Sequence, residues 1–435
     1  MEKLSGASAP LLKSIVLAKS IISYNQSTLE PDLFGGGTPA LTYMSIVEWS
    51  ITAFPVIMKG LTTLRLEDND LAKTPNGDLH LFEALEEMPN LRNLTLDIRR
   101  AFLGIPRNDC SVMLPNLQTF SFTGSLHAFP SFLGRLSLPS AASLIISLRP
   151  NPHYVYSHEY DPSIDFLELA CSLESSWLST NSRSLRCVQA RTSEESYNKL
   201  VLCGWLDECD PGRLSGIPDD LDGVCERVDK TLVEHADLRI DFGGTPPYST
   251  IRHVLEKFPL QGLTCIHLDV SLRKKDCALL ARLPVLQSVS LTQASFAEFC
   301  NYMSRDPVLL KYHSKEWRKL MKKYVREGMR LPPPKYFPEL KCLAIKDGDF
   351  GLFDYTLENI EDEAIDMEIF IESLTFRKKH SAPIRRLVLH HCYNVTDGEV
   401  DLMSEAVEGE VHKPEGQAKC ACRGERTWLN TYVRT

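Results

Sequence analysis

Near the end of the chain, two histidines and a cysteine stand side by side in the stretch LVLHHCYNVTD (387–397). Imidazole nitrogens and thiolates are good zinc ligands, and a histidine beside a nucleophile can act as a general base. Three such groups can share one metal ion or substrate only if the backbone turns them toward a common point. The chemistry of His390, His391 and Cys392 therefore depends on the element that positions them.

A short apolar pattern that recurs along the chain includes this stretch. LTTLRLEDNDL (61–71) has the L-x-x-L-x-L-x-x-N-x-L form of a leucine-rich repeat, and IRRLVL (384–389) repeats its core. Most spacings between neighbouring cores are close to the leucine-rich-repeat period of about 20–29 residues. The pattern predicts an α/β leucine-rich-repeat solenoid, with a curved parallel β-sheet on the concave face and helices and loops on the convex face. The twelve cores start at residues 12, 41, 61, 91, 117, 141, 185, 235, 263, 286, 340 and 384.

Residues that alternate with the buried apolar positions of each core should face solvent on the concave surface. They are polar in most copies, although Val16 and Val47 make the first two cores partly apolar, as a covering cap would require. Charges at 237–241 and 267–269 should cluster on adjacent strands. We predict partner-binding residues on this surface at Arg65, Glu67, Asp97, Asp237, Arg239, Asp241, His267, Asp269 and His390.

The same frame gives each residue of LVLHHC a place. Leu387 and Leu389 are buried strand positions, and Cys392 turns inward, where it packs or hydrogen-bonds weakly to backbone. His390 faces the concave surface and His391 points toward the end of the strand, so the two imidazoles should diverge and a metal site is not expected. No phosphate-binding loop, H-E-x-x-H pair or G-x-S-x-G elbow occurs. We therefore predict no catalytic residues, no metal, no cofactor and no enzyme activity.

Composition narrows the class of protein. The formal net charge of −9 argues against a general nucleic-acid binder, and no apolar run of about 18 residues predicts a membrane span. The N-terminal residues lack the apolar centre of a signal peptide. Thirteen cysteines without a regular spacing indicate reduced thiols in a cytoplasmic or nuclear protein.

Several segments interrupt the repeats. Helices are expected at 79–90, 164–178 and 224–236. An insertion at 297–335 is basic: from residue 301 it holds ten Lys/Arg against three Asp/Glu, with an apolar stripe at helical spacing. It could bind an acidic partner, a membrane or nucleic acid, or dock on residues 347–372, which hold ten Asp/Glu and no Lys/Arg. We expect a repeat domain of about twelve repeats over residues 1–400 and a helix with a polar tail over 401–435.

With the repeats in place, the chain resembles the leucine-rich-repeat regions of fungal F-box proteins. The stretches that carry the resemblance are ASAPLLKSIVL (7–17), LFGGGTPALTYMSI (33–46), GLTTLRLEDNDL (60–71) and IRRLVLHHCYNVTDGEV (384–400). The resemblance implies a substrate-recognition subunit of a Skp1–cullin–F-box ubiquitin ligase, although the F-box itself is not found before the first repeat. We expect a non-enzymatic protein-interaction scaffold that binds an unidentified protein along its concave sheet, with the ligase subunit, truncated or divergent in the F-box, as the alternative.

Overall fold

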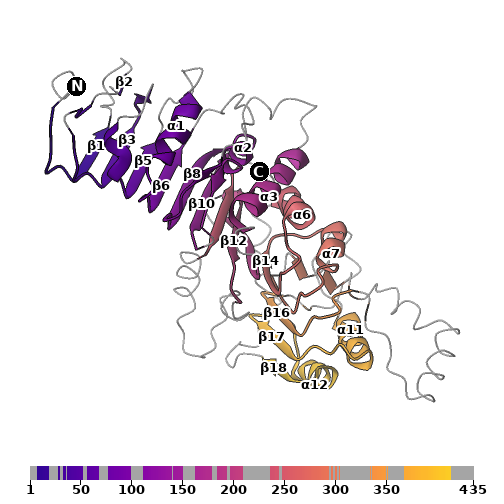
Figure 1. Ribbon diagram of the computed structural model, residues 1–435. Helices are drawn as coiled ribbons and strands as arrows, with labels where there is room; N and C mark the ends of the chain where they lie inside the picture. The colour runs from indigo at the N-terminus through magenta and orange to yellow at the C-terminus, as the bar shows by residue number, and fades with distance from the viewer. Residues whose placement is uncertain are drawn as a thin grey trace. The chain divides into compact units, whose positions relative to one another are not determined.

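The computed structural model is a mixed α/β structure with mostly parallel strand pairing (Figure 1). It divides into two compact units, unit 1 (Met1–Cys209 and Thr231–Leu263) and unit 2 (Asp210–Lys230 and Thr264–Thr435), where the sequence predicts one repeat domain. The boundary predicted at residue 400 falls inside a helix, α12 (Asp397–Ala406). The structure describes residues 7–18, 28–29, 33–35, 37–51, 56–67, 77–98, 111–139, 141–149, 162–178, 184–193, 196–208, 236–243, 247–292, 295–296, 299–300, 303, 334, 336–348, 350 and 367–412.

Each predicted core contains a strand, and many begin with the same turn. The amide of Leu61 donates to the carbonyl of Met58 at 3.1 Å, and the amides of Leu91 and Leu340 make the equivalent bonds at 3.1 and 3.2 Å. The repeated leucine thus closes a turn before its side chain enters the core. The strands are β1 (Ser14–Ala18), β3 (Tyr43–Val47), β5 (Thr63–Glu67), β6 (Asn93–Asp97), β8 (Thr119–Ser125), β10 (Ser143–Arg149), β11 (Cys187–Ser193), β13 (Leu238–Phe242), β14 (Cys265–Asp269), β15 (Ser288–Thr292), β16 (Cys342–Lys346) and β17 (Arg386–His390).

The main sheet of unit 1 is parallel from β1 through β3, β5, β6, β8 and β10 to β13. A strand that the repeat pattern does not predict, β12 (Ser196–Trp205), then pairs antiparallel with both β13 and β11. The core at residue 185 is therefore one strand of a hairpin, and the two antiparallel pairings in succession leave β11 running parallel to β13 with β12 between them. Two short parallel pairs lie outside this sheet: β2 (Thr28–Leu29) with β4 (Ser50–Ile51), and β7 (Val112–Met113) with β9 (Leu136–Ser137).

Helices cover one face of the unit 1 strands (Figure 1). The predicted helices at 79–90 and 164–178 are confirmed, and the side chains of Leu81, Leu85 and Met88 are buried as their spacing requires. Phenylalanines of β8 and α2 fill the space between the layers, with the rings of Phe122 and Phe129 4.5 Å apart. The helical elements are η2 (Val56–Gly60), α1 (Gly77–Glu86), α2 (Phe129–Leu133), α3 (Pro162–Leu173) with its continuation η3 (Glu174–Leu178), and α6 (Pro247–Lys257).

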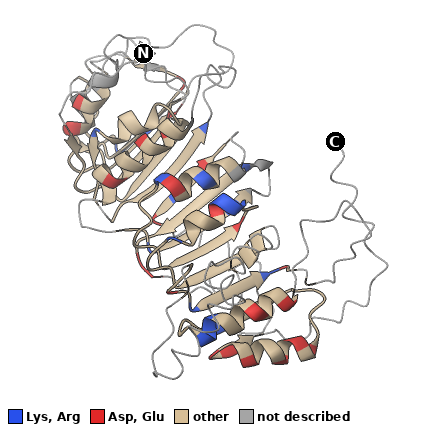
Figure 2. Ribbon diagram, turned by 90° about the vertical axis from the view of Figure 1, so that its right-hand side faces the viewer, with Lys and Arg blue, Asp and Glu red and all other residues tan. Residues whose placement is uncertain are grey.

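Unit 2 contains the parallel series β14, β15, β16, β17 and β18 (Glu410–His412). Its helices are α7 (Lys274–Leu280), α11 (Met367–Lys379) and α12. The basic last turn of α11 meets the end of the acidic helix α12 (Figure 2): Lys378 Nζ donates to the carbonyls of Glu405 at 2.6 Å and Val407 at 3.2 Å. A lysine at this position satisfies carbonyls that a helix end leaves without amide partners.

Three predicted segments lie wholly or largely outside the described residues. They are the helix at 224–236, the basic stripe within the insertion at 297–335, and most of the acidic stretch at 347–372. The prediction that the basic and acidic segments dock on one another therefore stays a prediction.

Candidate functional site

The helix-free face of the unit 1 sheet carries aligned polar side chains. On β5, Arg65 and Glu67 point to the same side because they are two residues apart, and Arg65 Nε donates to Glu67 Oε1 at 2.6 Å. This hydrogen bond is the largest of the effects that raise the pKa of Arg65 above its ordinary value. The parallel register sets Glu67 beside Asp97 and Arg65 beside Thr95 on β6. Three predicted residues thus lie together on one partly exposed face.

A second charged group lies on and before β13. Asp241 takes part in two ion pairs, with Lys199 Nζ of β12 at 3.1 Å and with Arg239 Nε at 3.6 Å. The carboxylate of Asp237 instead accepts the backbone amide of Leu206 at 2.8 Å, so it holds the end of β12 in place. Arg239 and Asp241 are therefore suited to meet a partner, whereas Asp237 has a structural role.

Between the two charged groups the face is rich in hydroxyl groups. The register aligns Thr119, Ser121 and Thr123 of β8 with Ser143, Ile145 and Ser147 of β10. All six side chains are at least partly exposed, and Ile145 is an exposed apolar residue among them. We call the partly exposed face formed by β5, β6, β8, β10 and β13 the unit 1 face.

The expectation that residues 237–241 and 267–269 lie on adjacent strands is wrong. β13 pairs with β10 and β12, and β14 pairs with β15, so β13 and β14 are not register partners. The two strands also belong to different compact units. The antiparallel hairpin of β11 and β12, which the repeat spacing does not reveal, is the reason: β12 occupies the place beside β13.

The predicted solvent exposure is also wrong for His267 of unit 2, whereas Asp269 is partly exposed. His267 is only 5% exposed, and its Nδ1 lies 2.9 Å from the hydroxyl of Ser290. Asp269 accepts a hydrogen bond from the hydroxyl of Thr292 at 2.9 Å. These cross-strand pairs satisfy polar groups on a face that is buried along the whole of β15. Ser290 is 1% exposed, so a substrate has no access to this serine–histidine pair.

The histidine pair of the opening stretch lies at the carboxyl end of β17. His390 is 7% exposed rather than open to solvent, and its pKa is lowered to about 4, first by burial and then by His391 and Lys346. The prediction that the two imidazoles diverge is wrong, because their ring centroids lie 4.1 Å apart. The cause is the backbone of His391, whose φ of 53° breaks the alternation of the strand. Cys392 behaves as predicted: its Sγ donates to the carbonyl of Ile345 at 3.5 Å.

Two charged residues missed by the repeat frame complete this edge of the sheet. Lys346, the last residue of β16, is the register partner of His390. Asp347 follows it with a φ of 57°, and burial is the main reason why the pKa of Asp347 is raised above its ordinary value. The Asp347–Gly348 dipeptide is a turn signal that could have drawn attention to this position.

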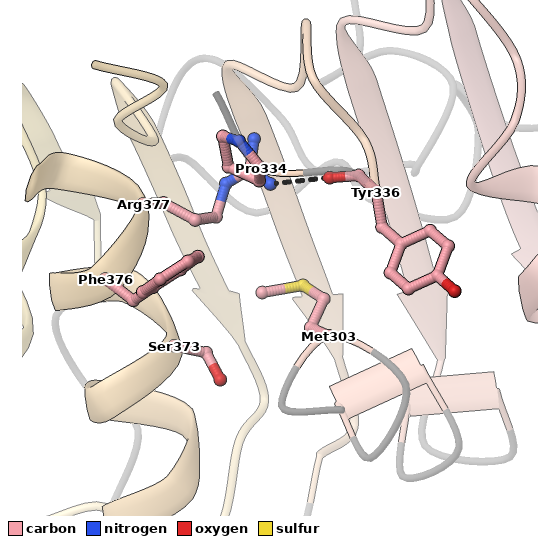
Figure 3. Close-up of a pocket in the computed structure, with 6 residues that line it drawn as sticks. All are labelled: Met303, Pro334, Tyr336, Ser373, Phe376 and Arg377. Atoms are coloured by element: carbon pink, nitrogen blue, oxygen red, sulfur yellow. Dashed lines mark hydrogen bonds between the residues drawn. The ribbon is translucent and has the colours of Figure 1, made fainter. Parts of the chain in front are cut away.

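A small hollow in unit 2 opens between α11 and the segment before β16 (Figure 3). Arg377 is the one charged residue among the six that line it. Its guanidinium donates to the carbonyls of Tyr336 at 3.2 Å, Phe337 at 2.7 Å and Leu340 at 3.3 Å. Arg377 therefore braces the turn that leads into β16, which is a structural role. The lining residues are Met303, Pro334, Tyr336, Ser373, Phe376 and Arg377.

Two further properties concern the described part of the chain alone. Within it, no group of three or more histidine, cysteine, aspartate or glutamate side chains is placed to hold a metal ion. No helix in the same residues has the length and apolar character needed to cross a bilayer.

Compared with known proteins, the chain matches no protein-family model and no curated protein sequence.

Proposed function

We propose that this chain is a non-enzymatic protein-interaction scaffold of the leucine-rich-repeat type, which binds a protein partner through the unit 1 face. The observation that carries the proposal is the parallel register that brings Arg65, Glu67 and Asp97 into one partly exposed group. A function in the cytoplasm or nucleus fits the described cysteines, none of which forms a disulfide.

The composition of the unit 1 face suits a polypeptide partner. Arginine is enriched in protein interfaces, because its planar guanidinium forms directed hydrogen bonds and retains little hydration. Arg65 and Arg239 each lie beside a carboxylate of the same strand, at 2.6 and 3.6 Å, so both signs of charge are available. Hydroxyl groups between them can donate to or accept from a partner backbone. Such a mixed surface favours specific recognition over general binding to a polyanion.

Charge reversal on the unit 1 face tests this proposal. The double variant Arg65→Glu/Arg239→Glu should lose partners that the wild-type chain captures, with affinity for a purified partner reduced at least about tenfold. The measurement is quantitative affinity purification with mass spectrometry, followed by direct titration of the enriched protein. Both residues are partly exposed, so the variant should keep its fold, but each reversal replaces an ion pair with two neighbouring carboxylates, so a modest fall in melting temperature is expected.

The matched control is Arg252→Glu on helix α6. Arg252 belongs to the same unit and forms an exposed i,i+4 pair with Glu256 at 2.9 Å. This substitution changes the net charge by the same amount per site but lies on a helix of the opposite layer. Equal loss of capture in both variants, or full retention in the double variant, would reject the unit 1 face as the binding surface.

The alternative is a substrate-recognition subunit of a Skp1–cullin–F-box ubiquitin ligase. Two features favour the resemblance to the cysteine-containing repeats of F-box proteins. They are the hydrogen bond from the thiol of Cys392 to a backbone carbonyl and the capping box that Thr396 forms at the start of α12. Co-purification of Skp1 with the chain would support this role. If Skp1 is absent while other partners are retained, the scaffold function stands without it.

A further inference from the structure

A second group of side chains, in unit 2, lies at the carboxyl ends of β16 and β17. Lys346 and His390 end these two strands as register partners, so their side chains leave the same face of the sheet about 5 Å apart at the backbone. The exposed ring of His391 lies against that of His390, with centroids 4.1 Å apart. We call Lys346, His390 and His391 the basic edge.

Among the described residues, the basic edge has a carboxylate nearby, Asp347, but no partner in direct contact with Lys346 Nζ or His390 Nδ1. Among the described residues, Lys346 forms no ion pair within 4 Å, although Asp347 is near enough to feel its charge. The Nδ1 atom of His390 is buried and has no hydrogen-bond partner. A buried polar atom without a partner destabilises a structure unless a ligand satisfies it. Burial is the largest cause of the lowered pKa of His390. The positive charges of His391 and Lys346 lower this pKa further.

The backbone holds the basic edge in place. Asp347 and His391 occupy equivalent positions after β16 and β17, and both have a left-handed φ, of 57° and 53°. The amide of Asp347 donates to the carbonyl of His390 at 2.9 Å, and the amide of Tyr393 donates to the carbonyl of Gly348 at 2.8 Å. A non-glycine residue in this conformation costs free energy, which these bonds offset. Glu48 after β3 has the same conformation, with a φ of 62°, and its amide donates to the carbonyl of Glu67 at 2.9 Å.

We propose that Lys346, His390 and His391 bind an oxyanion, the carboxylate or phosphate group of a ligand, at the carboxyl ends of β16 and β17. The ammonium of Lys346 supplies the charge, an N–H of the neutral imidazole of His390 can donate a hydrogen bond to an anionic oxygen, and His391 forms the exposed side. Asp347 competes with the ligand, since it lies close to Lys346 and His391. Burial and Asp269 favour its neutral form, so the competition weakens as the pH falls and anion binding should strengthen.

The test uses the full chain with sodium sulfate as the probe, because sulfate keeps its charge from pH 5 to 7. Sulfate replaces chloride at constant ionic strength, and the backbone amide resonances of Asp347 and His391 are followed by NMR. We expect saturable shifts at these amides, with the dissociation constant raised about tenfold in Lys346→Gln. Lys341→Gln, which changes a lysine just before the start of the same strand, is the matched control and should keep the wild-type constant.

Two further arms sharpen the result. Inorganic phosphate and acetate, titrated separately, show which oxyanion the basic edge prefers. Asp347→Asn, in which asparagine tolerates the left-handed backbone, should bind sulfate more tightly than wild type at pH 7 and lose the part of the pH dependence that Asp347 contributes. The proposal fails if the amides of Asp347 and His391 show no saturable shift, if Lys346→Gln binds as well as Lys341→Gln, or if Asp347→Asn weakens binding.

Discussion

His390 makes the stability of unit 2 depend on pH at the scale of one residue. Its pKa of about 4 in the folded chain compares with an ordinary value of 6.5. Between these values the unfolded chain binds the proton and the folded chain does not, so stability is fully present above pH 6.5 and falls as the pH drops toward 4. We expect a loss on the order of 1–3 kcal/mol in the free energy of unfolding between pH 7 and 4.5, measured by urea denaturation.

Two variants separate the contribution of His390 to this pH dependence from the contributions of neighbouring titratable residues. His390→Gln should flatten the pH dependence, whereas His391→Gln removes an exposed imidazole and should leave most of it. The raised pKa of Asp347 acts in the opposite direction, because the folded chain then holds a proton that the unfolded chain releases. The comparison is therefore cleanest in an Asp347→Asn background. If the free energy of unfolding of His390→Gln still falls as the pH drops from 7 to 4.5, the pH dependence belongs to groups other than His390.

Individual residues were predictable where the repeat frame determines their neighbours. Cys392 hydrogen-bonds to backbone as its position in the frame predicts, since the inward turn after the strand leaves little choice. His391 was not predictable, because its positive φ depends on the loop bonds between Gly348 and Tyr393, which come from another repeat. Lys346 was missed for a related reason: its importance comes from the register with β17, which no local pattern contains.

At the scale of elements, the pairing of β18 with β17 depends on a glycine. A Cβ atom at Gly409 would overlap the carbonyl oxygen of Arg385, the atom that accepts the amide of Glu410 at 2.9 Å. Gly409→Ala should therefore cost about 1–3 kcal/mol and increase hydrogen exchange at β18. Gly398, in the first turn of α12, has no atom within 4 Å of such a Cβ. Gly398→Ala should instead stabilise by up to about 1 kcal/mol, and equal effects of the two substitutions would contradict this view.

The strands themselves were largely predictable. Every core supplies a strand in the expected place, because alternating apolar residues after a leucine-closed turn leave few other ways to bury them. The direction of pairing was not predictable from the same pattern. β11 has the core at residue 185 but forms a hairpin with β12, since a strand with alternating apolar residues can pair in either direction. Burial of both faces of β15 also escaped prediction, because Ser288 and Ser290 are polar residues at buried positions.

At the scale of the whole molecule, repetition along the sequence did not reveal where compact units end. The division between Leu263 and Thr264 falls within a well-formed repeat core, LTCIHL (263–268), so composition and spacing give no sign of it. It depends instead on the sum of long-range contacts. The division matters for function, since the unit 1 face and the basic edge belong to different units.

Separate units predict separate binding properties. Arg65→Glu/Arg239→Glu should abolish partner capture and leave the sulfate dissociation constant at the basic edge unchanged, whereas Lys346→Gln should do the reverse. Substitutions without shared contacts usually act additively, within about 0.5 kcal/mol. The triple variant should therefore combine both losses without a coupling energy, as measured by partner titration with and without saturating sulfate. A partner affinity that changes with sulfate in the wild type but not in Lys346→Gln would show instead that the basic edge binds an acidic group of the same partner, and the two surfaces would then form one interface.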